Sequence, residues 1–367
     1  MKKIIVSVSN DVFNDNRVEK TCNSLCKYGL NVFLVGKRTK DSPKLPKKHF
    51  AVYRMKTLCK KNVFYYMELN IRLFFFLLFK RTDILWANDL DTLLPNYLVS
   101  KIKNKPLIFD SHELFWAIAE LKDTRIKREF WRLLERKMVP NIKYVITVCE
   151  PIKKYFQKNY KVNASLVRNI PLFEEKNQER KCFPLKEKII VWQGSANVDR
   201  GLEELVLAMK NVDAKLYIIG RGDIVDNLKQ EIIDNDLKNK VFLFGRLTFD
   251  EMMAYTRRAT IAISIDKPTN KNYEISLPNK IFEYINSATP IVCTPLKEIE
   301  AVVKKYDVGF VIKDFSVDNL SKQINEIINN DSLLQKKSDN CILAQKELSW
   351  QNEEQHIFEV LNKIQEK

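Results

Sequence analysis

Short apolar runs rich in β-branched residues alternate with longer segments of helical period along the whole sequence. This alternation predicts parallel strands joined by crossover helices, because a parallel neighbour can be reached only by a long return connection. In the first half the expected strands are Lys3–Ser9, Asn31–Val35, Phe50–Arg54, Asp83–Ala87, Leu107–Asp110, Tyr144–Val148 and Ser165–Val167. In the second half they are Ile189–Gln193, Lys215–Ile219, Val241–Phe244, Thr260–Ile265, Pro290–Cys293 and Gly309–Ile312. Two such sets predict an α/β fold made of two doubly wound, Rossmann-like domains.

The length of the chain agrees with two domains. Single cores tend to stop growing at about 250–300 residues, and this chain has 367. Residues 174–188 are rich in charge and poor in apolar side chains, so we expect the interdomain linker there, between domains at 1–173 and 189–345. Residues 346–367 are expected to form a helix that buries one apolar face on an existing domain, through Ile357, Val360, Leu361 and Ile364.

No secretion or membrane-spanning segment is expected. The apolar stretch Ile4–Val8 meets Asn10 too early for the core of a signal peptide. The most lipid-like stretch, 63–79, carries Glu68 and Arg72, whereas a spanning helix needs about 20 mostly apolar residues. The seven cysteines are scattered and show no zinc-binding spacing with the three histidines. We therefore expect a cytoplasmic protein with reduced thiols and without a metal or other cofactor.

The net charge of +16 is unevenly distributed. Residues 1–173 contain 34 Lys and Arg against 15 Asp and Glu, which leaves +19, whereas the remainder contains 28 against 31, which leaves −3. A one-sided basic half indicates an anionic partner, either acidic lipid headgroups or nucleic acid. Base-stacking motifs and recognition helices are not evident, so no nucleic-acid partner is expected.

Residues 123–138, DTRIKREFWRLLERKM, are a candidate basic amphipathic helix within this basic half. Its apolar side is expected to contain Ile126, Phe130, Leu133 and Leu134. The basic residues around that side are Arg125, Lys127, Arg128, Arg132, Arg136 and Lys137. Such a helix suits the surface of an anionic membrane. The alternative is an ordinary surface helix whose apolar stripe packs on its own domain.

The segment 276–290, SLPNKIFEYINSATP, is the strongest local indication of a ligand site. Pro278 suits the first turn of a helix, where free N–H groups and the positive end of the helix dipole attract an anion such as a phosphate. Glu283 lies one and a half turns further along, where a carboxylate can accept hydrogen bonds from both hydroxyls of a ribose. The alternative interpretation is that Glu283 is a solvated helix residue.

Several runs resemble one enzyme family in both halves of the chain. Three runs resemble the donor-binding half of retaining GT-B glycosyltransferases, the class called glycosyl transferases group 1: VWQGSANVDRGLEELVLAM, LYIIGRGD and LPNKIFEYINSATPIV. Four runs are similar to the acceptor half of one subgroup: NRVEKTCNSLCKYGLNVFLV, ILWANDLDTLLP, LIFDSHELF and YVITVCEPIKKYF. The run LSWQNEEQHIFEVL resembles the helix that crosses back to the first domain in this family. The resemblance thus covers nearly the whole chain and implies a GT-B fold.

The resemblance assigns donor-binding residues in the second half. Glu283 matches the second glutamate of the family's E-x7-E motif, which binds the donor ribose, while Ile275 occupies the place of the first glutamate. Arg200 matches a basic residue that contacts the donor diphosphate, which agrees with bidentate binding of phosphate by guanidinium. Lys280 is expected to supply further positive charge. The other expected donor contacts are Gly194, Ser195, Gly220 and Asn279.

In the first half, the resemblance implies that His112 contacts the donor sugar near the reaction centre. Asp110 and Glu113 are expected beside it, either bonded to substrate or shaping the loop. Asp89, in Asp-Leu-Asp, is interpreted as a loop residue and helix cap on the acceptor side and not as a metal ligand. Two more acceptor-side contacts are expected where other families have a glycine-rich turn, Asn10 and Arg17.

These residues imply transfer of a sugar from a nucleotide-sugar donor to a glycan or a lipid-linked saccharide, with retention of configuration and in the context of bacterial surface polysaccharide biosynthesis. Basic side chains and a helix dipole can stabilise the departing diphosphate without a metal. One alternative is a nucleotide-sugar epimerase on the same fold. Another is a non-catalytic protein in which the basic domain binds a membrane or nucleic acid and the second domain binds a nucleotide.

Overall fold

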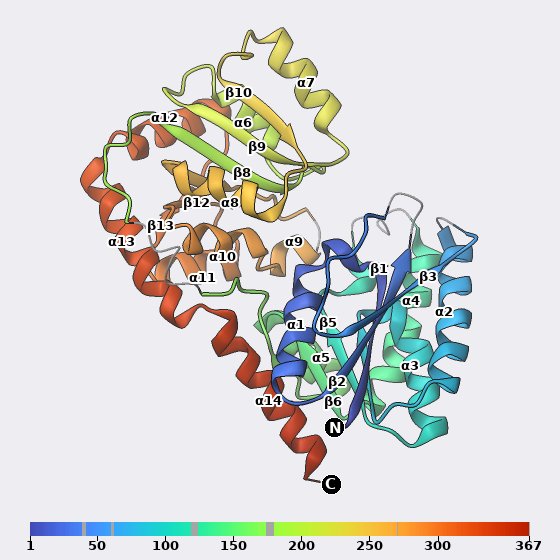
Figure 1. Cartoon of the computed structure of the whole chain (residues 1–367). Helices are drawn as coiled ribbons and strands as arrows, with labels where there is room; N and C mark the ends of the chain where they lie inside the picture. Colours follow the sequence, from blue (N-terminus) through green and yellow to red (C-terminus); the bar gives the residue numbers. More distant parts are fainter. Residues whose placement is uncertain (39–41, 60–61, 119–123, 174–179, 270, 367) are drawn as a thin grey trace. The chain divides into compact units, whose positions relative to one another are not determined.

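Every strand expected from the sequence is present in the computed structural model, which describes residues 1–38, 42–59, 62–118, 124–173, 180–269 and 271–366. The chain divides into two units (Figure 1). The first unit comprises Met1–Asn169 together with Glu353–Lys367, and the second comprises Ile170–Asn352.

The first unit is built on a parallel sheet with the strand order β3-β2-β1-β4-β5-β6-β7. Its strands are β1 (Lys3–Asp11), β2 (Asn31–Arg38), β3 (Ala51–Lys56), β4 (Ile84–Asn88), β5 (Leu107–Ser111), β6 (Tyr144–Thr147) and β7 (Ser165–Leu166). The central strands are short continuous apolar runs because helices cover both faces of the sheet. The sheet order brings the ends of β1, β4 and β5 next to one another, and each is followed by polar residues.

Helices connect and cover these strands. They are α1 (Asn16–Lys27), α2 (Asn62–Phe79), α3 (Leu90–Lys103), α4 (Arg125–Met138) and α5 (Glu150–Tyr160). Helix α2 buries one side through leucines spaced four residues apart: Leu69, Leu73 and Leu77. This spacing places them on a single face, which packs beside α3 (Figure 1).

The carboxyl-terminal helix α14 (Trp350–Gln365) returns to the first unit, as the sequence predicted. Glu353 is buried and pairs with Arg168, with 2.6 Å between Oε1 and Nη2. The next residue, Glu354, accepts a hydrogen bond of 2.7 Å from Ser24 Oγ on α1 and pairs with Lys27. Charge pairing therefore supplements the apolar face in attaching this helix.

The second unit has the strand order β10-β9-β8-β11-β12-β13, again parallel throughout. Its strands are β8 (Ile189–Ser195), β9 (Lys215–Arg221), β10 (Val241–Gly245), β11 (Ile261–Ser264), β12 (Ile291–Cys293) and β13 (Gly309–Val311). Its helices are α6 (Leu202–Ala208), α7 (Val225–Asp234), α8 (Phe249–Arg258), α9 (Lys271–Ile275), α10 (Asn279–Asn286), α11 (Lys297–Lys305), α12 (Val317–Ile328) and α13 (Asp331–Glu347). Apolar clusters lie on both faces of this sheet and include Trp192 on one and Tyr284 on the other.

The expected linker is only partly described. Residues 174–179 lie outside the described residues, whereas 180–188 pack on the second unit. Lys181 is buried there and donates hydrogen bonds to Thr289 Oγ1 at 2.6 Å and to the Ala259 carbonyl at 2.8 Å. Burial lowers the pKa of Lys181 to about 7. The two carbonyl and hydroxyl acceptors satisfy this ammonium group, so its role is structural.

Among the helices of the described residues, none combines the length and apolar character needed to cross a membrane.

Candidate active site

Polar residues of the first unit meet where β4 and β5 end. Asp89 follows β4, Asp110 lies near the end of β5, and His112 directly follows β5. The Asp89 N–H donates to the Asp110 carbonyl at 2.9 Å, which joins the two strand ends. Because parallel strands present their carboxyl ends at one edge, residues distant in sequence converge here. The geometry thus brings Asp89 together with Asp110 and His112, which the sequence had selected from a different segment.

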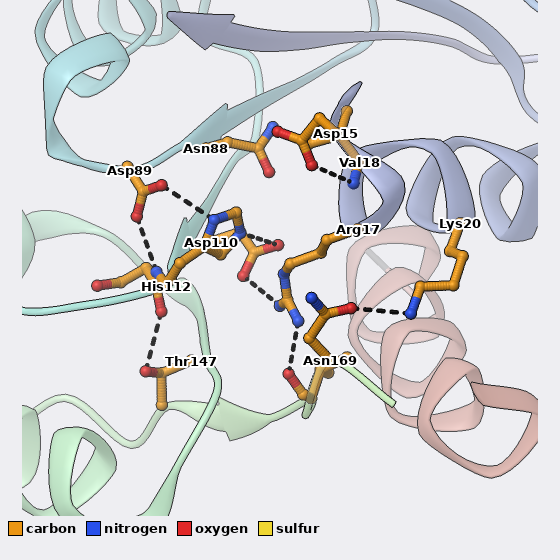
Figure 2. Close-up of polar contacts among 12 residues, drawn as sticks. Asp15, Arg17, Val18, Lys20, Asn88, Asp89, Asp110, His112, Thr147 and Asn169 are labelled. Atoms are coloured by element: carbon orange, nitrogen blue, oxygen red, sulfur yellow. Dashed lines mark hydrogen bonds and ion pairs between the residues drawn. The ribbon is translucent and has the colours of Figure 1, made fainter. Parts of the chain in front are cut away.

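The imidazole of His112 lies between two carboxylates (Figure 2). Its Nδ1 is 2.9 Å from Asp89 Oδ2, and its Nε2 is 3.3 Å from Asp110 Oδ2. The backbone N–H of His112 also donates to Asp89 Oδ1 at 2.8 Å. The side chain remains 22% exposed, so a ligand can still approach it.

Arg17 completes this network from the start of α1. Its Nη2 is 2.8 Å from Asp110 Oδ1, and its Nη1 donates to the Val167 carbonyl at 3.0 Å (Figure 2). The side chain is only 5% exposed. Arg17 was expected as an acceptor contact, but its guanidinium is engaged within the protein. Arg17 therefore acts mainly by stabilising the charged form of Asp110.

These charges set the protonation states of the network. Burial favours the neutral form of Asp110, but the positive charges of Arg17 and His112 outweigh burial and lower its pKa below the usual range. Burial also disfavours the charged form of His112, yet Asp89 and Asp110 raise its pKa to about 10. His112 is thus an imidazolium near neutral pH. Its two ring N–H groups face Asp89 and Asp110, and it is not a general base.

A further carboxyl group, Asp91, is buried beneath this network. Burial and the negative charge of Asp89 raise the pKa of Asp91 to about 7. Asp89 and Asp91 therefore have different environments, since one is paired with an imidazolium and the other is desolvated. Among the described residues, no group of three or more His, Cys, Asp and Glu is arranged to hold a metal ion.

Asp89 occupies the N-cap position of α3, as expected, but its side chain makes no capping hydrogen bond to that helix. Its backbone has a φ of 56°, a left-handed value, and its carboxylate bonds to both the ring and the backbone of His112 instead. A charged partner outcompetes the backbone donors of the helix.

Two other residues of the predicted set lie around the network. Asn10 Nδ2 donates to Asp15 Oδ2 at 2.8 Å, and Asp15 in turn caps α1 by accepting from the Val18 N–H. Asn10 thus supports the helix turn that carries Arg17. Glu113 is exposed, and its carbonyl accepts a hydrogen bond from Ser111 Oγ at 3.1 Å.

The second unit holds a separate cluster in which two cations share one carboxylate. Arg200 Nη1 and Lys280 Nζ each lie 3.3 Å from Oδ1 of Asp266, which is fully buried. Arg200 precedes α6, Lys280 lies in the first turn of α10, and Asp266 follows β11. Because one carboxylate cannot neutralise two cations, this pair retains positive charge for an anionic ligand.

Aromatic rings hold both cations in place. The Arg200 guanidinium lies 4.1 Å from the ring centroid of Tyr273, and the Lys280 ammonium lies 4.9 Å from that of Trp192. Burial lowers the pKa of Lys280, although Asp266 partly offsets that effect. Cation–π contacts of this kind favour the charged form. The two expected donor-site cations are thereby brought together and oriented.

Glycines bring β8 and β9 close together beside this cluster. Gly194 and Gly220 have φ values of 135° and 151°, which residues with a Cβ rarely adopt. A Cβ on Gly220 would lie 1.8 Å from the Gly194 carbonyl oxygen, so any other residue would displace the backbone. Ser195 follows Gly194 and is exposed. Because these glycines lack a Cβ, a ligand can approach the backbone closely here.

Helix α10 carries the remaining predicted donor-site residues. Pro278 is its N-cap, exposed Asn279 is its first residue, and Lys280 follows. Glu283 is half-buried, and its Oε2 accepts a hydrogen bond from Gln193 Nε2. Gln193 in turn accepts from Thr256 Oγ1 at 2.8 Å. The carboxylate of Glu283 is therefore held by a chain of hydrogen bonds that begins on α8.

Asp266 and Gln193 were missed by the sequence analysis. Both had a usable signal. Gln193 is the last residue of an expected strand, and Asp266 directly follows another, where ligand-contacting residues gather in parallel sheets. Asp91 was noted only as part of Asp-Leu-Asp, and its burial is not readable from that pattern.

Family models match both units. The model described as "Glycosyl transferases group 1" matches residues 173–347, and the model described as "Glycosyltransferase Family 4" matches residues 16–173. Together they cover 16–347. The chain therefore belongs to the glycosyl transferases group 1, with an amino-terminal unit of the family 4 type, as the resemblance had implied.

Individual relatives agree with this assignment. An uncharacterised glycosyltransferase of Methanocaldococcus jannaschii is 22% identical over 208 residues, which is 56% of each chain. This match spans little more than half of that relative. Sucrose-phosphate synthase of Thermosynechococcus elongatus has a similar structure, with a TM-score of 0.81, 13% identity and 99% of both chains covered. HepE of Anabaena in complex with UDP-glucose has a TM-score of 0.75 and 14% identity, with 99% of this chain and 100% of that chain covered. These two structures support the GT-B fold.

Proposed function

We propose that the protein transfers a sugar from a nucleotide-sugar donor to a hydroxyl group of a glycan or lipid-linked saccharide, with retention of anomeric configuration. In this proposal the second unit binds the donor and the first unit binds the acceptor. The observation that carries it is the convergence of Arg200 and Lys280 on Asp266 beside the amino-terminal end of α10. A doubly cationic site at a helix start suits the diphosphate of the donor and of the leaving nucleotide.

Glu283 is the proposed ribose ligand. It lies on the same helix as Lys280, and its bond to Gln193 fixes one carboxylate oxygen. A carboxylate held in this way can accept hydrogen bonds from vicinal hydroxyl groups. Asn279, Gly194, Ser195 and Gly220 are proposed to border the bound nucleotide. The complex of HepE with UDP-glucose makes uridine nucleotides the first donors to test.

The His112 network is proposed to act on the transferred sugar. The ring of His112 would contact the sugar, and Asp89 and Asp110 would position the ring. Arg17 and Asn10 are proposed to support this arrangement, and Glu113 to border the sugar. In this proposal Arg200 and Lys280, and not the His112 network, stabilise the negative charge that develops on the leaving group, without a metal ion.

The first unit is further proposed to associate with the anionic cytoplasmic face of a membrane, where a lipid-linked acceptor would be available. The support is its excess of basic residues and the cations of α4. Each Lys or Arg near such a surface is worth about 1 kcal/mol, so a few of them give reversible attachment that salt weakens.

A panel of nucleotide sugars tests the proposed activity. Each donor is incubated with the protein, with and without a polyprenyl-linked saccharide, and nucleoside diphosphate release is measured. The proposal expects that nucleoside diphosphate is released from one class of donor and that this release increases when acceptor is present. Conversion of a donor into another nucleotide sugar without acceptor would instead indicate an epimerase. Nucleotide binding without turnover of any donor would contradict an enzymatic role.

A further inference from the structure

Helix α2 exposes a continuous apolar stripe. The exposed side chains recur at spacings of three and four residues and therefore share one face: Phe64, Met67, Ile71, Phe75 and Phe79. Phe79 is 81% exposed. The adjacent helix α3 adds exposed Leu98 and Ile102. Contiguous exposed apolar surface of this kind marks an interaction site in a soluble unit.

Helix α4 exposes three of the four apolar residues that the sequence had identified, and the fourth, Leu134, is half-buried. Ile126 is 88% exposed, and Phe130 and Leu133 are exposed one and two turns further along. The domain-facing side instead contains Trp131, Glu135 and Met138. Most of the predicted apolar stripe therefore does not pack on its own domain. The buried Glu135 explains this orientation, because it accepts hydrogen bonds from two hydroxyl groups of α5, those of Tyr155 and Tyr160.

Trp131 connects the two helices. Its ring packs edge-on against Tyr66 of α2, with the centroids 5.5 Å apart, and against exposed Phe130 at the same separation. On α2, Met67 follows Tyr66 and belongs to the exposed stripe. This aromatic contact joins α2 and α4 at Tyr66 and Trp131, each of which is the sequence neighbour of a stripe residue, Met67 and Phe130.

The charge around these stripes is positive. The exposed basic residues of α4 are Arg125, Lys127, Arg132, Arg136 and Lys137. Helix α2 contains a single carboxylate, Glu68, which pairs with Arg72 at 2.7 Å and accepts hydrogen bonds from the N–H groups of Leu58 and Cys59. This carboxylate is thus occupied within the protein. Apolar side chains bordered by cations are the composition of a helix that lies in the interface of an anionic bilayer.

We propose that α2 and α4 form a membrane-docking surface whose apolar stripes insert into the interface of an anionic bilayer. This inference deepens the membrane association proposed above and rests on it, because it assigns attachment to inserted apolar side chains as well as to charge. A second copy of the chain is a poorer occupant. Residues 1–173 carry a net +19, so pairing two such faces would oppose like charges.

Vesicle flotation of the full chain tests the proposal. The vesicles are phosphatidylglycerol mixed with phosphatidylcholine, or phosphatidylcholine alone. The test variant carries Phe64→Gln, Met67→Gln and Ile71→Gln, which keep good helix formers on α2. The matched control carries Ile233→Gln and Leu343→Gln, which replace exposed apolar residues of the second unit. Circular dichroism melting establishes that both variants fold.

The proposal expects the α2 variant to bind anionic vesicles at least about tenfold more weakly than wild type, because each buried methylene contributes about 0.8 kcal/mol. The control should bind like wild type. At about 0.5 M salt, where screening removes long-range attraction, wild type should retain more binding than the α2 variant. Nucleotide affinity should be equal in all three proteins. Loss of vesicle binding with unchanged nucleotide affinity would therefore show that the substitutions affect the docking surface and not the donor site.

Two results would overturn the proposal. One is equal binding of the α2 variant and wild type to anionic vesicles. The other is a wild-type dimer in sedimentation velocity that the α2 substitutions dissociate, without vesicle binding by either protein, which would assign the surface to a second copy. If wild type binds vesicles through α2 but turns over no nucleotide sugar, the surface stands and the proposed enzymatic function fails.

Discussion

The Nδ1 atom of His112 lies 2.9 Å from Oδ2 of Asp89, although the two residues follow different strands. The pairing depends on the neighbouring positions of β4 and β5 in the sheet. Together with Asp110 on the other side of the ring, it makes His112 a cation at neutral pH. This arrangement leads to a specific prediction about protonation.

Asp89→Asn should lower the pKa of His112, because it removes one of the two carboxylates that stabilise the imidazolium. In wild type the ring should remain protonated up to about pH 10. Nitrogen-15 NMR of the His112 ring measures this directly, with Asp89→Asn compared against wild type. A wild-type His112 that loses its proton near the ordinary histidine pKa of 6.5 would contradict the assigned charge state.

His112→Ala should abolish most turnover while leaving nucleotide affinity unchanged. The reason is that the proposed diphosphate and ribose ligands all come from the second unit. The measurement is the rate of donor turnover together with calorimetric nucleotide affinity. The folded variant should melt as a cooperative protein. Turnover at the wild-type rate would make His112 a structural residue.

Arg200→Ala should weaken nucleoside diphosphate binding by about 1.5–3 kcal/mol, the range for hydrogen bonds to charged groups. Glu283→Gln should weaken binding of a nucleotide and leave binding of inorganic pyrophosphate unchanged, since its proposed contact is with the ribose. The control is Arg258→Ala, at the exposed end of α8 in the same unit. Unchanged affinity in both test variants would remove these residues from the donor site.

The buried Asp91 predicts a pH-dependent change in stability. Because its pKa in the folded protein is about 7, above the ordinary value of 3.8, the folded state binds the proton more tightly than the unfolded chain. Asp91 therefore costs stability progressively as the pH rises from about 4 to about 7, by up to about 1.4 kcal/mol per pKa unit. Asp91→Asn should remove this cost.

Thermal melting at several pH values measures that effect. The difference in Tm between Asp91→Asn and wild type should increase from pH 4 to pH 7 and then level off. A difference that does not vary with pH would mean that Asp91 is charged or neutral throughout this range.

The sheets were predictable because their strands are buried on both faces and therefore read as uninterrupted apolar runs. The β8 strand is an example, since Ile189–Gln193 is buried throughout. A residue at a strand end, His112, and a residue of a helix that follows a loop, Glu283, were also predictable individually. In both cases a local pattern was sufficient.

The pairings within each cluster were not predictable. Arg17 bonds to Asp110 across a separation of 93 residues, and the sequence does not state which strands are neighbours. The orientation of α4 depended on Glu135, whose hydroxyl partners lie on another helix. A carboxylate within an amphipathic helix is normally assigned to the solvent side. Its burial therefore required the tertiary structure.

The central claim is that a sugar leaves a nucleotide donor and is joined to an acceptor with its configuration retained. The most direct measurement follows the sugar itself, with a donor labelled with carbon-13 at the anomeric position, a saccharide acceptor and time-resolved NMR. The account predicts that the label appears in a new glycosidic linkage with the donor's anomeric configuration, together with free nucleoside diphosphate. Label that remains in a nucleotide sugar of altered stereochemistry, or enters a linkage of opposite configuration, would contradict it.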